Sequence, residues 1–340
     1  MSGFRKRTPG SATTSTPTSA VSQPTRGTRI SGFNGKSVCS FGVASLDASI
    51  GEMPVGSVFL VLGDRGSGYA ALIKKYLASQ AVACGNVLCS VGDSSNDPEE
   101  FVKELFKVVD EESTASKEDE DDEGVVETSS QRELGGGLRD ANSRLSIAWR
   151  YQGLPSLSTP KVNSQSKSIG PYCCMFDITQ TMNAETLDKT SIAIVNVSSW
   201  VNSEENVTAK VVYSRLFDSI LEIVNKGKFR NSDASVTPNL LRIVIQDIGG
   251  PFWGTDAGSQ TAFVELIRFL GRIRGLIRDC RAVLVVGLRG YLFDGYQDGG
   301  GVEKSEKSGW LKAVMHAVDG VLEVESFSGT SNRARVHARV

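Results

Sequence analysis

The chain is poor in several residue types on which common kinds of site depend. It has only two histidines, His316 and His337, and its six cysteines form no C-x-x-C pair. Because zinc sites are built mainly from clustered Cys and His ligands, we expect no metal site. Nothing in the sequence fixes a Ser-His-Asp or Cys-His pairing either, so a hydrolase is not indicated. We expect the cysteines to be reduced structural thiols.

Long hydrophobic runs are also missing. No apolar stretch approaches the roughly 20 residues that a membrane-spanning helix needs, so we expect no membrane partner. The N-terminal residues include basic side chains but no apolar segment of the kind that a secretory signal requires. We therefore expect a protein of the cytoplasm and nucleus.

Charge is unevenly distributed along the chain. Residues 1–29 hold five arginines and lysines and no acid, whereas residues 110–123 hold nine carboxylates and one lysine. We expect a disordered basic tail, rich in Ser, Thr and Pro, over 1–28, and a disordered acidic and glycine-rich insertion over about 110–142. The remaining body is nearly neutral, which does not favour nucleic-acid binding by bulk charge alone.

Strand and helix patterns alternate through residues 29–340, and order is expected to return after the insertion at Arg144–Pro155. Such alternation predicts one three-layer α/β/α domain with a mostly parallel central sheet. The alternation consists of the following segments. Strands are expected at 58–62, 86–93 and 191–199, and over the runs LLRIVIQD and AVLVVGL. Helices are expected after Gly68, after Val207 and over AFVELIRFLGRIRGLIRDC. The last residues, RARVHARV, alternate like a strand and the chain stops there, as expected of a truncated C-terminus.

A glycine-rich loop follows the first of these strands. It has the frame G-x-x-x-x-G-K-[ST] of a phosphate-binding P-loop, but Tyr69 stands at the lysine position and Ala70 at the hydroxyl position. Backbone amides of such a loop can hold an anion without the lysine, whereas catalysis also needs the cation and the magnesium-binding hydroxyl. The interpretation we favour is a structural relic; nucleotide binding and a working ATPase are the alternatives. We expect no cofactor, ATP being the alternative, and the degenerate nucleotide-site positions are Gly63, Gly66, Ser67, Gly68, Tyr69 and Asp247.

Asp247 enters this set because it ends an apolar strand, as the magnesium-orienting aspartate of a Walker B strand does. With Ala70 opposite, a strand-end cap or loop anchor is the favoured role. Arg65 and Lys74 are the nearest replacements for the missing cation.

Two further features could contact RNA. The helix around residues 261–280 carries Arg268, Arg272, Arg274 and Arg278, for which RNA contact, a subunit interface and a solvated face are all open. The loop at 289–301 follows the end of a strand, where open α/β sheets bind ligands. Its Arg289, Tyr291 and Tyr296 are the candidate RNA-binding residues, the tyrosines through stacking on bases.

The segment FGVASLDASIGEMPVGSVFLVLGDRGSG resembles the entry of a RecA/KaiC-type domain. Within that superfamily, LSIAWRYQGLP and GTRISGFNGKSVCSFGVASLD resemble the family of the fourth subunit of Elongator, whose members also lack a standard P-loop lysine. The resemblance covers residues 29–340 apart from the acidic insertion.

The resemblance implies a RecA-like fold and a non-catalytic role. It implies a heterohexameric ring with the fifth and sixth Elongator subunits, attached to the Elongator catalytic core. That complex modifies the wobble uridine of certain transfer RNAs, and it has been linked to RNA polymerase II elongation. Transfer RNA is thus the expected nucleic-acid partner, and an ATP-dependent RecA/KaiC-type ATPase with an irregular site is the alternative.

Overall fold

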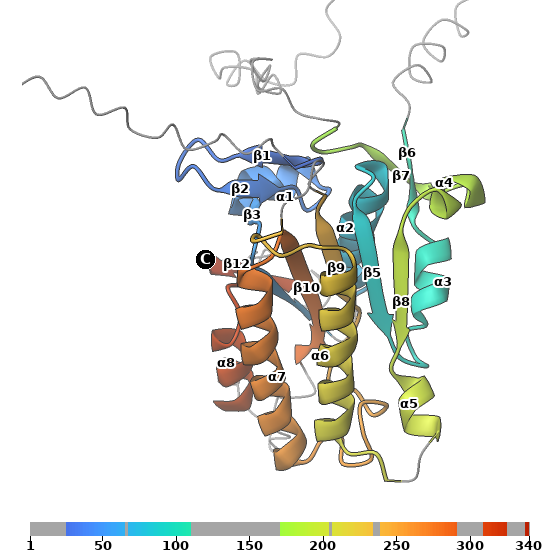
Figure 1. The fold of residues 1–340 in the computed structure, drawn as a ribbon, viewed down its shortest axis with the longest axis vertical. Coiled ribbons are helices and arrows are strands. Elements are labelled where there is room, and N and C mark those ends of the chain that lie inside the picture. The colour runs from blue at the N-terminus through green and yellow to red at the C-terminus, as the bar shows by residue number, and fades with distance from the viewer. Residues whose placement is uncertain are drawn as a thin grey trace, which may run out of the picture.

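The computed structural model describes residues 25–64, 67–109, 171–203, 206–233, 239–290, 309–324 and 337–339. Nearly all of the expected N-terminal tail, the insertion at 110–142, the segment at 144–155 and most of the loop at 289–301 lie outside these residues. The described residues form the strands and helices of one α/β arrangement (Figure 1).

The main sheet has seven strands in the order β12-β11-β4-β10-β9-β5-β8. All neighbouring strands are parallel except β12, which pairs antiparallel with β11 at the sheet edge. This confirms the expected three-layer domain with a mostly parallel sheet. The strands are β4 Val58–Gly63, β5 Val87–Gly92, β8 Ile192–Asn196, β9 Leu241–Ile245, β10 Ala282–Arg289, β11 Gly320–Val324 and β12 His337–Arg339.

Helices cover both faces of this sheet, with α6 and α7 in front of it and α2 behind it in Figure 1. The helices are α1 Ala44–Ile50, α2 Tyr69–Ala83, α3 Pro98–Lys103, α4 Ala184–Asp188, α5 Ser198–Ser203, α6 Ala209–Lys226, α7 Gln260–Arg278 and α8 Gly309–His316. Side chains alternate across a strand, and β4 shows the result: Leu60 packs toward α6 and α7, whereas Val61 packs toward α2. Burial on both faces explains why the central strands are continuous apolar runs.

Two small antiparallel sheets lie at the amino end of the parallel strands, at the top of Figure 1. One consists of β1 Thr28–Ile30, β2 Ser37–Cys39 and β3 Met53–Pro54, and the other of β6 Phe106–Val108 and β7 Phe176–Thr181. The carboxyl ends of the parallel strands lie at the opposite end of the sheet.

One expected boundary is wrong. The strand predicted at 191–199 ends at Asn196, and Ser198 already begins α5. The Asn196 Oδ1 atom accepts a hydrogen bond from the Ser198 backbone N–H at 3.0 Å, a local turn that competes with a continued strand.

Candidate functional site

The glycine-rich loop joins β4 to α2, as the sequence predicts. The Asp64 Oδ1 atom accepts hydrogen bonds from the Ser67 backbone N–H at 2.9 Å and from the Ser67 hydroxyl at 2.6 Å. In a working P-loop, backbone N–H groups of this kind point at phosphate oxygens. Here the Ser67 N–H donates instead to the carboxylate of Asp64 in the same loop. Gly66 and Arg65 lie outside the described residues.

The two substituted positions begin the helix that follows the loop. Tyr69 is 47 % exposed, while Ala70 packs against the core on the α2 side of the sheet. A β-carbon at Gly63 would lie 3.0 Å from the Ala70 β-carbon, so the strand and the helix already approach closely there. Gly68 is the N-cap of α2 and provides no side-chain cap. Tyr69 provides no cation at the lysine position, and Ala70 provides no hydroxyl at the position of the metal-binding Ser or Thr.

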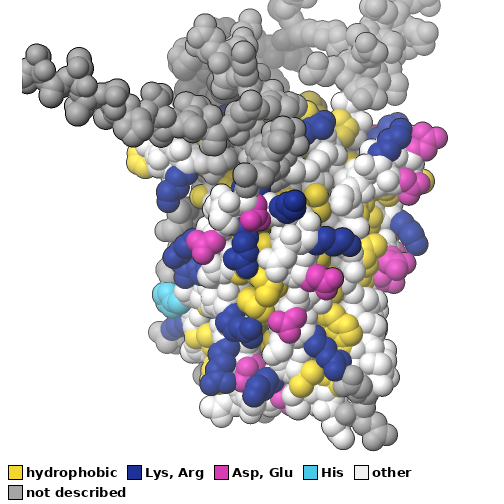
Figure 2. Space-filling view, in the orientation of Figure 1, with side chains coloured by type: hydrophobic (Ala, Val, Ile, Leu, Met, Phe, Trp, Pro, Cys, Tyr) yellow, Lys and Arg dark blue, Asp and Glu magenta, His cyan; other side chains and the backbone are white. Residues whose placement is uncertain are grey.

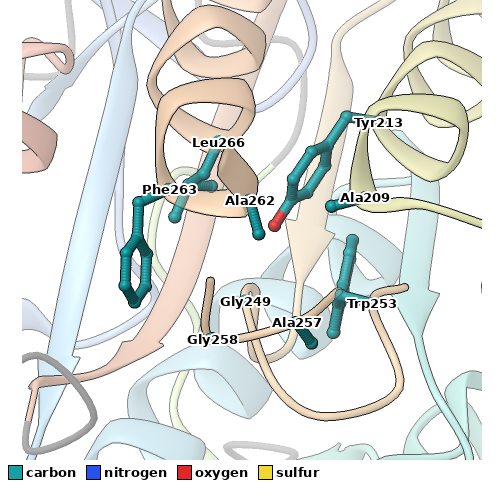
Figure 3. A pocket seen from close by; sticks show the side chains of 9 residues that line it. All are labelled: Ala209, Tyr213, Gly249, Trp253, Ala257, Gly258, Ala262, Phe263 and Leu266. Atoms are coloured by element: carbon teal, nitrogen blue, oxygen red, sulfur yellow. The ribbon is translucent and has the colours of Figure 1, made fainter. Parts of the chain in front are cut away.

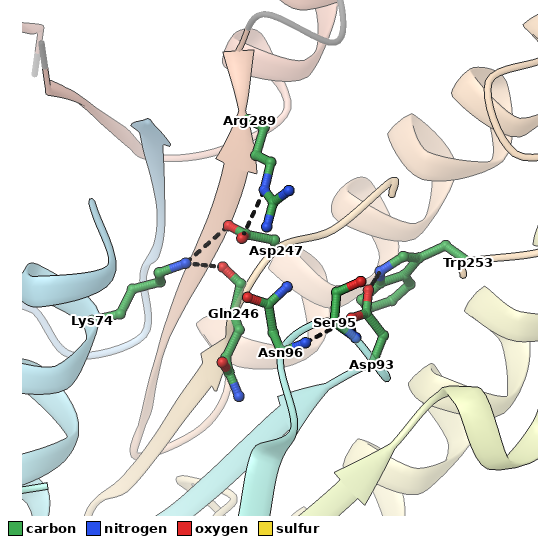
Figure 4. Close-up of polar contacts among 8 residues, drawn as sticks. All are labelled: Lys74, Asp93, Ser95, Asn96, Gln246, Asp247, Trp253 and Arg289. Atoms are coloured by element: carbon green, nitrogen blue, oxygen red, sulfur yellow. Dashed lines mark hydrogen bonds and ion pairs between the residues drawn. The ribbon is translucent and has the colours of Figure 1, made fainter. Parts of the chain in front are cut away.

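Asp247 is the second residue after β9, and two cations engage it (Figure 4). The Lys74 Nζ atom, from the second turn of α2, lies 2.9 Å from Asp247 Oδ1 and also donates to the Gln246 carbonyl oxygen. The Arg289 Nε atom, from the end of β10, lies 3.2 Å from Asp247 Oδ2. Each carboxylate oxygen therefore has its own cationic partner.

Lys74 is the more deeply buried of these two cations. Its side chain is 4 % exposed, and burial lowers its pKa below the ordinary value, although the Asp247 carboxylate opposes this shift. Space for the ammonium group comes from Gly287 on β10. A β-carbon at this position would lie 2.5 Å from Lys74 Nζ and 1.7 Å from the Gln246 carbonyl oxygen. A side chain at residue 287 is thus incompatible with the ion pair.

A second carboxylate, Asp93, lies just after β5 at the same edge of the sheet, and sequence reasoning missed it. Its Oδ1 atom accepts from the backbone N–H groups of Ser95 and Asn96 at 2.8 and 3.1 Å. Its Oδ2 atom accepts from Trp253 Nε1 at 3.0 Å (Figure 4). Asp93 is 3 % exposed and anchors two loops, which does not suit a general base. The run GDSSN after an apolar strand was the available signal, since it favours such an Asx turn.

A small cavity lies beside Trp253, between α6 and α7 (Figure 3). Its volume is about 10 Å³, room for about one water molecule. The rings of Tyr213 and Trp253 stack beside it at 5.9 Å, and burial raises the pKa of the Tyr213 hydroxyl well above its ordinary value. This cavity is too small for a nucleotide.

The arginine-bearing helix α7 has most of its cations paired. Arg274 and Arg278 both contact Asp319, at 2.7 and 3.4 Å, and Arg268 contacts Glu265 at 2.5 Å. The Arg272 guanidinium lies 4.1 Å from the centre of the Phe217 ring. Figure 2 shows Lys and Arg side chains interspersed with Asp and Glu on this face, an arrangement typical of a solvated helix face.

Of the candidate RNA-binding residues, the structure describes Arg289 alone; Tyr291 and Tyr296 lie outside the described residues. The Arg289 side chain is 43 % exposed while it contacts Asp247, so part of this side chain is accessible to solvent.

All six cysteines are free. Burial raises the pKa of Cys39 to about 11 and that of Cys89 to about 12, as expected for unreactive thiols. Within the described ranges, no group of three or more His, Cys, Asp or Glu side chains is arranged to hold a metal ion. No helix in the described part of the chain is long and apolar enough to cross a membrane.

The fold is that of a three-layer RecA-like α/β domain, and the chain's own side chains engage both the Ser67 amide of its glycine-rich loop and the Asp247 carboxylate. Comparison with known proteins gives the particular family. The model of the PAXNEB protein family matches residues 21–339, and the chain belongs to this family.

Its curated relatives carry the name Elongator complex protein 4. The Xenopus laevis protein is 30% identical over 314 residues, which cover 91% of this chain and 70% of the relative. The Homo sapiens protein is 27% identical, covering 89% of this chain and 67% of the relative. The Dictyostelium discoideum protein is 26% identical, and the match covers 89% of this chain and 64% of the relative. The fourth-subunit family that the sequence resembles is thereby confirmed.

Proposed function

We propose that the chain is a non-catalytic subunit of the Elongator complex. In this proposal it forms a RecA-like heterohexameric ring with the fifth and sixth subunits, and the ring joins the Elongator catalytic core. The ring binds transfer RNA and supports modification of the wobble uridine; a link to RNA polymerase II elongation is part of the same hypothesis. Membership of the Elongator complex protein 4 family supports the assembly.

The observation that carries the non-catalytic part is the double engagement of Asp247. A magnesium-orienting aspartate must offer an oxygen to the metal's water shell, but Lys74 and Arg289 each occupy one oxygen. Tyr69 and Ala70 supply neither of the missing groups. Binding of Mg-ATP would have to displace two ion pairs without gaining the usual ligands in return.

Transfer RNA binding is assigned to the assembled ring because the body of this chain is nearly neutral. Several subunits presenting loops around one RNA would raise the affinity through multivalency. Arg289 is the described residue that we assign to this contact, and Tyr291 and Tyr296 remain predictions. We propose the cytoplasm and nucleus as locations, and the six free cysteines fit a reducing compartment.

The alternative is an ATPase with an irregular site, and one observation favours it. Lys74 places an ammonium group from the P-loop helix at the carboxyl edge of the sheet, and this group could serve a phosphate if it left Asp247. The two functions predict different effects of a substitution at Asp247 on ATP turnover: no change for the assembly subunit, and loss of turnover for the ATPase.

The test is co-expression of the chain with the fifth and sixth subunits. We expect a stable ring that binds transfer RNA, and ATP turnover that is the same for the wild-type ring and for a ring carrying Asp247→Asn in this chain. Turnover by the isolated chain that Asp247→Asn abolishes would establish the ATPase instead. In cells lacking the chain, mass spectrometry of wobble uridine should show loss of the modification, and the Asp247→Asn variant should restore it. Failure to co-purify with either partner would refute the ring.

A further inference from the structure

Strand β7, Phe176–Thr181, lies outside the main sheet and is only partly paired. It is paired antiparallel with β6, but the three paired residues of β7 are Phe176, Asp177 and Thr181, because the register shifts between Phe106 and Lys107. Its other edge has no strand beside it in the part of the chain that the structure describes. A two-stranded ladder of this kind is marginally stable in water by itself.

The apolar side chains around β7 show where support is missing. Phe176, at the start of the strand, packs against the Tyr76 ring of α2 with the ring centres 6.0 Å apart. Ile178, two residues further on, is 57 % exposed. Met175 is 77 % exposed. A strand edge that exposes apolar side chains and has neither proline nor lysine to block pairing is a template for another strand.

The chain itself contains a suitable strand between β6 and β7. Residues 110–170 connect them, and their two ends are adjacent, since the Val109 N–H donates to the Met175 carbonyl oxygen at 2.9 Å. Within this connection, residues 145–152 alternate strictly. The large apolar or aromatic side chains are Leu145, Ile147, Trp149 and Tyr151, and the residues between them are Ser146, Ala148, Arg150 and Gln152. This is the period of a strand with one apolar face.

We propose that residues 145–152 dock on the open edge of β7 as the third strand of this small sheet. The row containing Ile147 and Trp149 lies on the face of Phe176 and Ile178, where same-face pairs stabilise a sheet. The connecting residues 153–170 reach up to about 60 Å when extended, so the docking is within reach. The acidic block at 110–123 has no apolar row and is not the occupant. This inference does not depend on the proposed function.

Hydrogen exchange of the full-length chain, followed by mass spectrometry, tests the proposal. The reporter is the peptide covering 176–181. The test variant is Ile147→Asp/Trp149→Asp, and the matched control is Ser146→Asp/Ala148→Asp, which adds the same two charges to the opposite row. A second control deletes 110–123. Peptides from β4 and β9 report whether the main sheet stays folded.

We expect the reporter to be protected in the wild-type chain and to exchange about tenfold or more faster in the test variant. Both controls should keep the wild-type rate. An unprotected reporter in the wild-type chain overturns the proposal, as does an equal response of the test and control variants. Protection that rises with chain concentration would identify a second copy as the occupant. Protection that appears only with the partner subunits would identify one of them. Identification of a second copy or of a partner subunit as the occupant would also overturn the proposal.

Discussion

Lys74 and Asp247 are 173 positions apart in the sequence, and their side chains meet at 2.9 Å at the carboxyl edge of the main sheet. The ammonium group comes from the P-loop helix and the carboxylate from the end of β9. The pair thus joins the two motifs that a nucleotide and its magnesium ion join in a RecA-type ATPase. In this chain the two side chains contact each other directly.

The first prediction concerns the stability of this ion pair. Lys74→Met should lower the free energy of unfolding by about 3 kcal/mol, because it leaves a largely buried carboxylate with one cation instead of two. Lys75→Met is the matched control. Lys75 is the next residue along the helix and pairs with Glu104 on the surface, so its substitution should lower the free energy of unfolding by less than about 1 kcal/mol. Urea denaturation of the three proteins measures both. Equal losses would show that the Lys74 pair is an ordinary surface contact.

The second prediction concerns Asp64. Asp64→Ala removes the carboxylate that occupies the Ser67 amide and repels other anions, so inorganic phosphate should bind about tenfold more tightly than to the wild-type chain. Asp64→Ser removes the charge but keeps an acceptor for Ser67 and should give a smaller gain. Calorimetric titration with phosphate compares the three. An unchanged affinity in Asp64→Ala would mean that the loop amides do not face a ligand position.

The third prediction concerns RNA binding by the assembled ring. Arg289→Ala in this chain should weaken transfer RNA binding and reduce the salt slope, by up to about one unit for each RNA phosphate that Arg289 neutralises. Arg268→Ala, whose side chain contacts Glu265 on α7, is the control and should change neither quantity. A salt titration of both rings supplies the comparison. Identical slopes for Arg289→Ala and wild type would exclude this residue from the RNA site.

The fourth prediction is a pH dependence. Burial raises the pKa of Cys89 from 9.0 to about 12, so the folded chain holds this proton more tightly than the unfolded chain. The resulting stability is complete below pH 9 and is lost as the pH rises from 9 toward 12, by about 1.4 kcal/mol per pH unit for one thiol. In urea denaturation between pH 9 and 10.5, the free energy of unfolding of Cys89→Val should fall less steeply with pH than that of the wild-type chain, by that amount per pH unit. At pH 7 the thiol is protonated in both the folded and the unfolded chain, so the difference in free energy of unfolding between the two proteins at that pH measures the change in packing alone. A parallel decline in both proteins would contradict a buried, protonated thiol.

Much of the fold could be predicted because its signals are local. The strand at 58–62 and the helix after Gly68 follow from apolar runs and helical spacing, and the structure places β4 and α2 there. The end of the strand before Ser198 was missed because a side-chain turn, and not a change in hydrophobicity, ends it. For the candidate site, the sequence drew attention to the glycine-rich loop and to Asp247, but not to Asp93, whose hydrogen bonds only the folded chain shows.

The sequence by itself determined the class of fold and the departure of the glycine-rich loop from a standard P-loop, because strand-helix alternation and the identities of Tyr69 and Ala70 are properties of neighbouring residues. Only the tertiary structure decided which cations surround Asp247. Parallel strands bring their carboxyl ends to one edge, so Lys74, Asp247 and Arg289 meet although long stretches of chain separate them. Gly287 matters for the same reason: its missing side chain leaves room for an ammonium group that comes from a helix far away in the sequence.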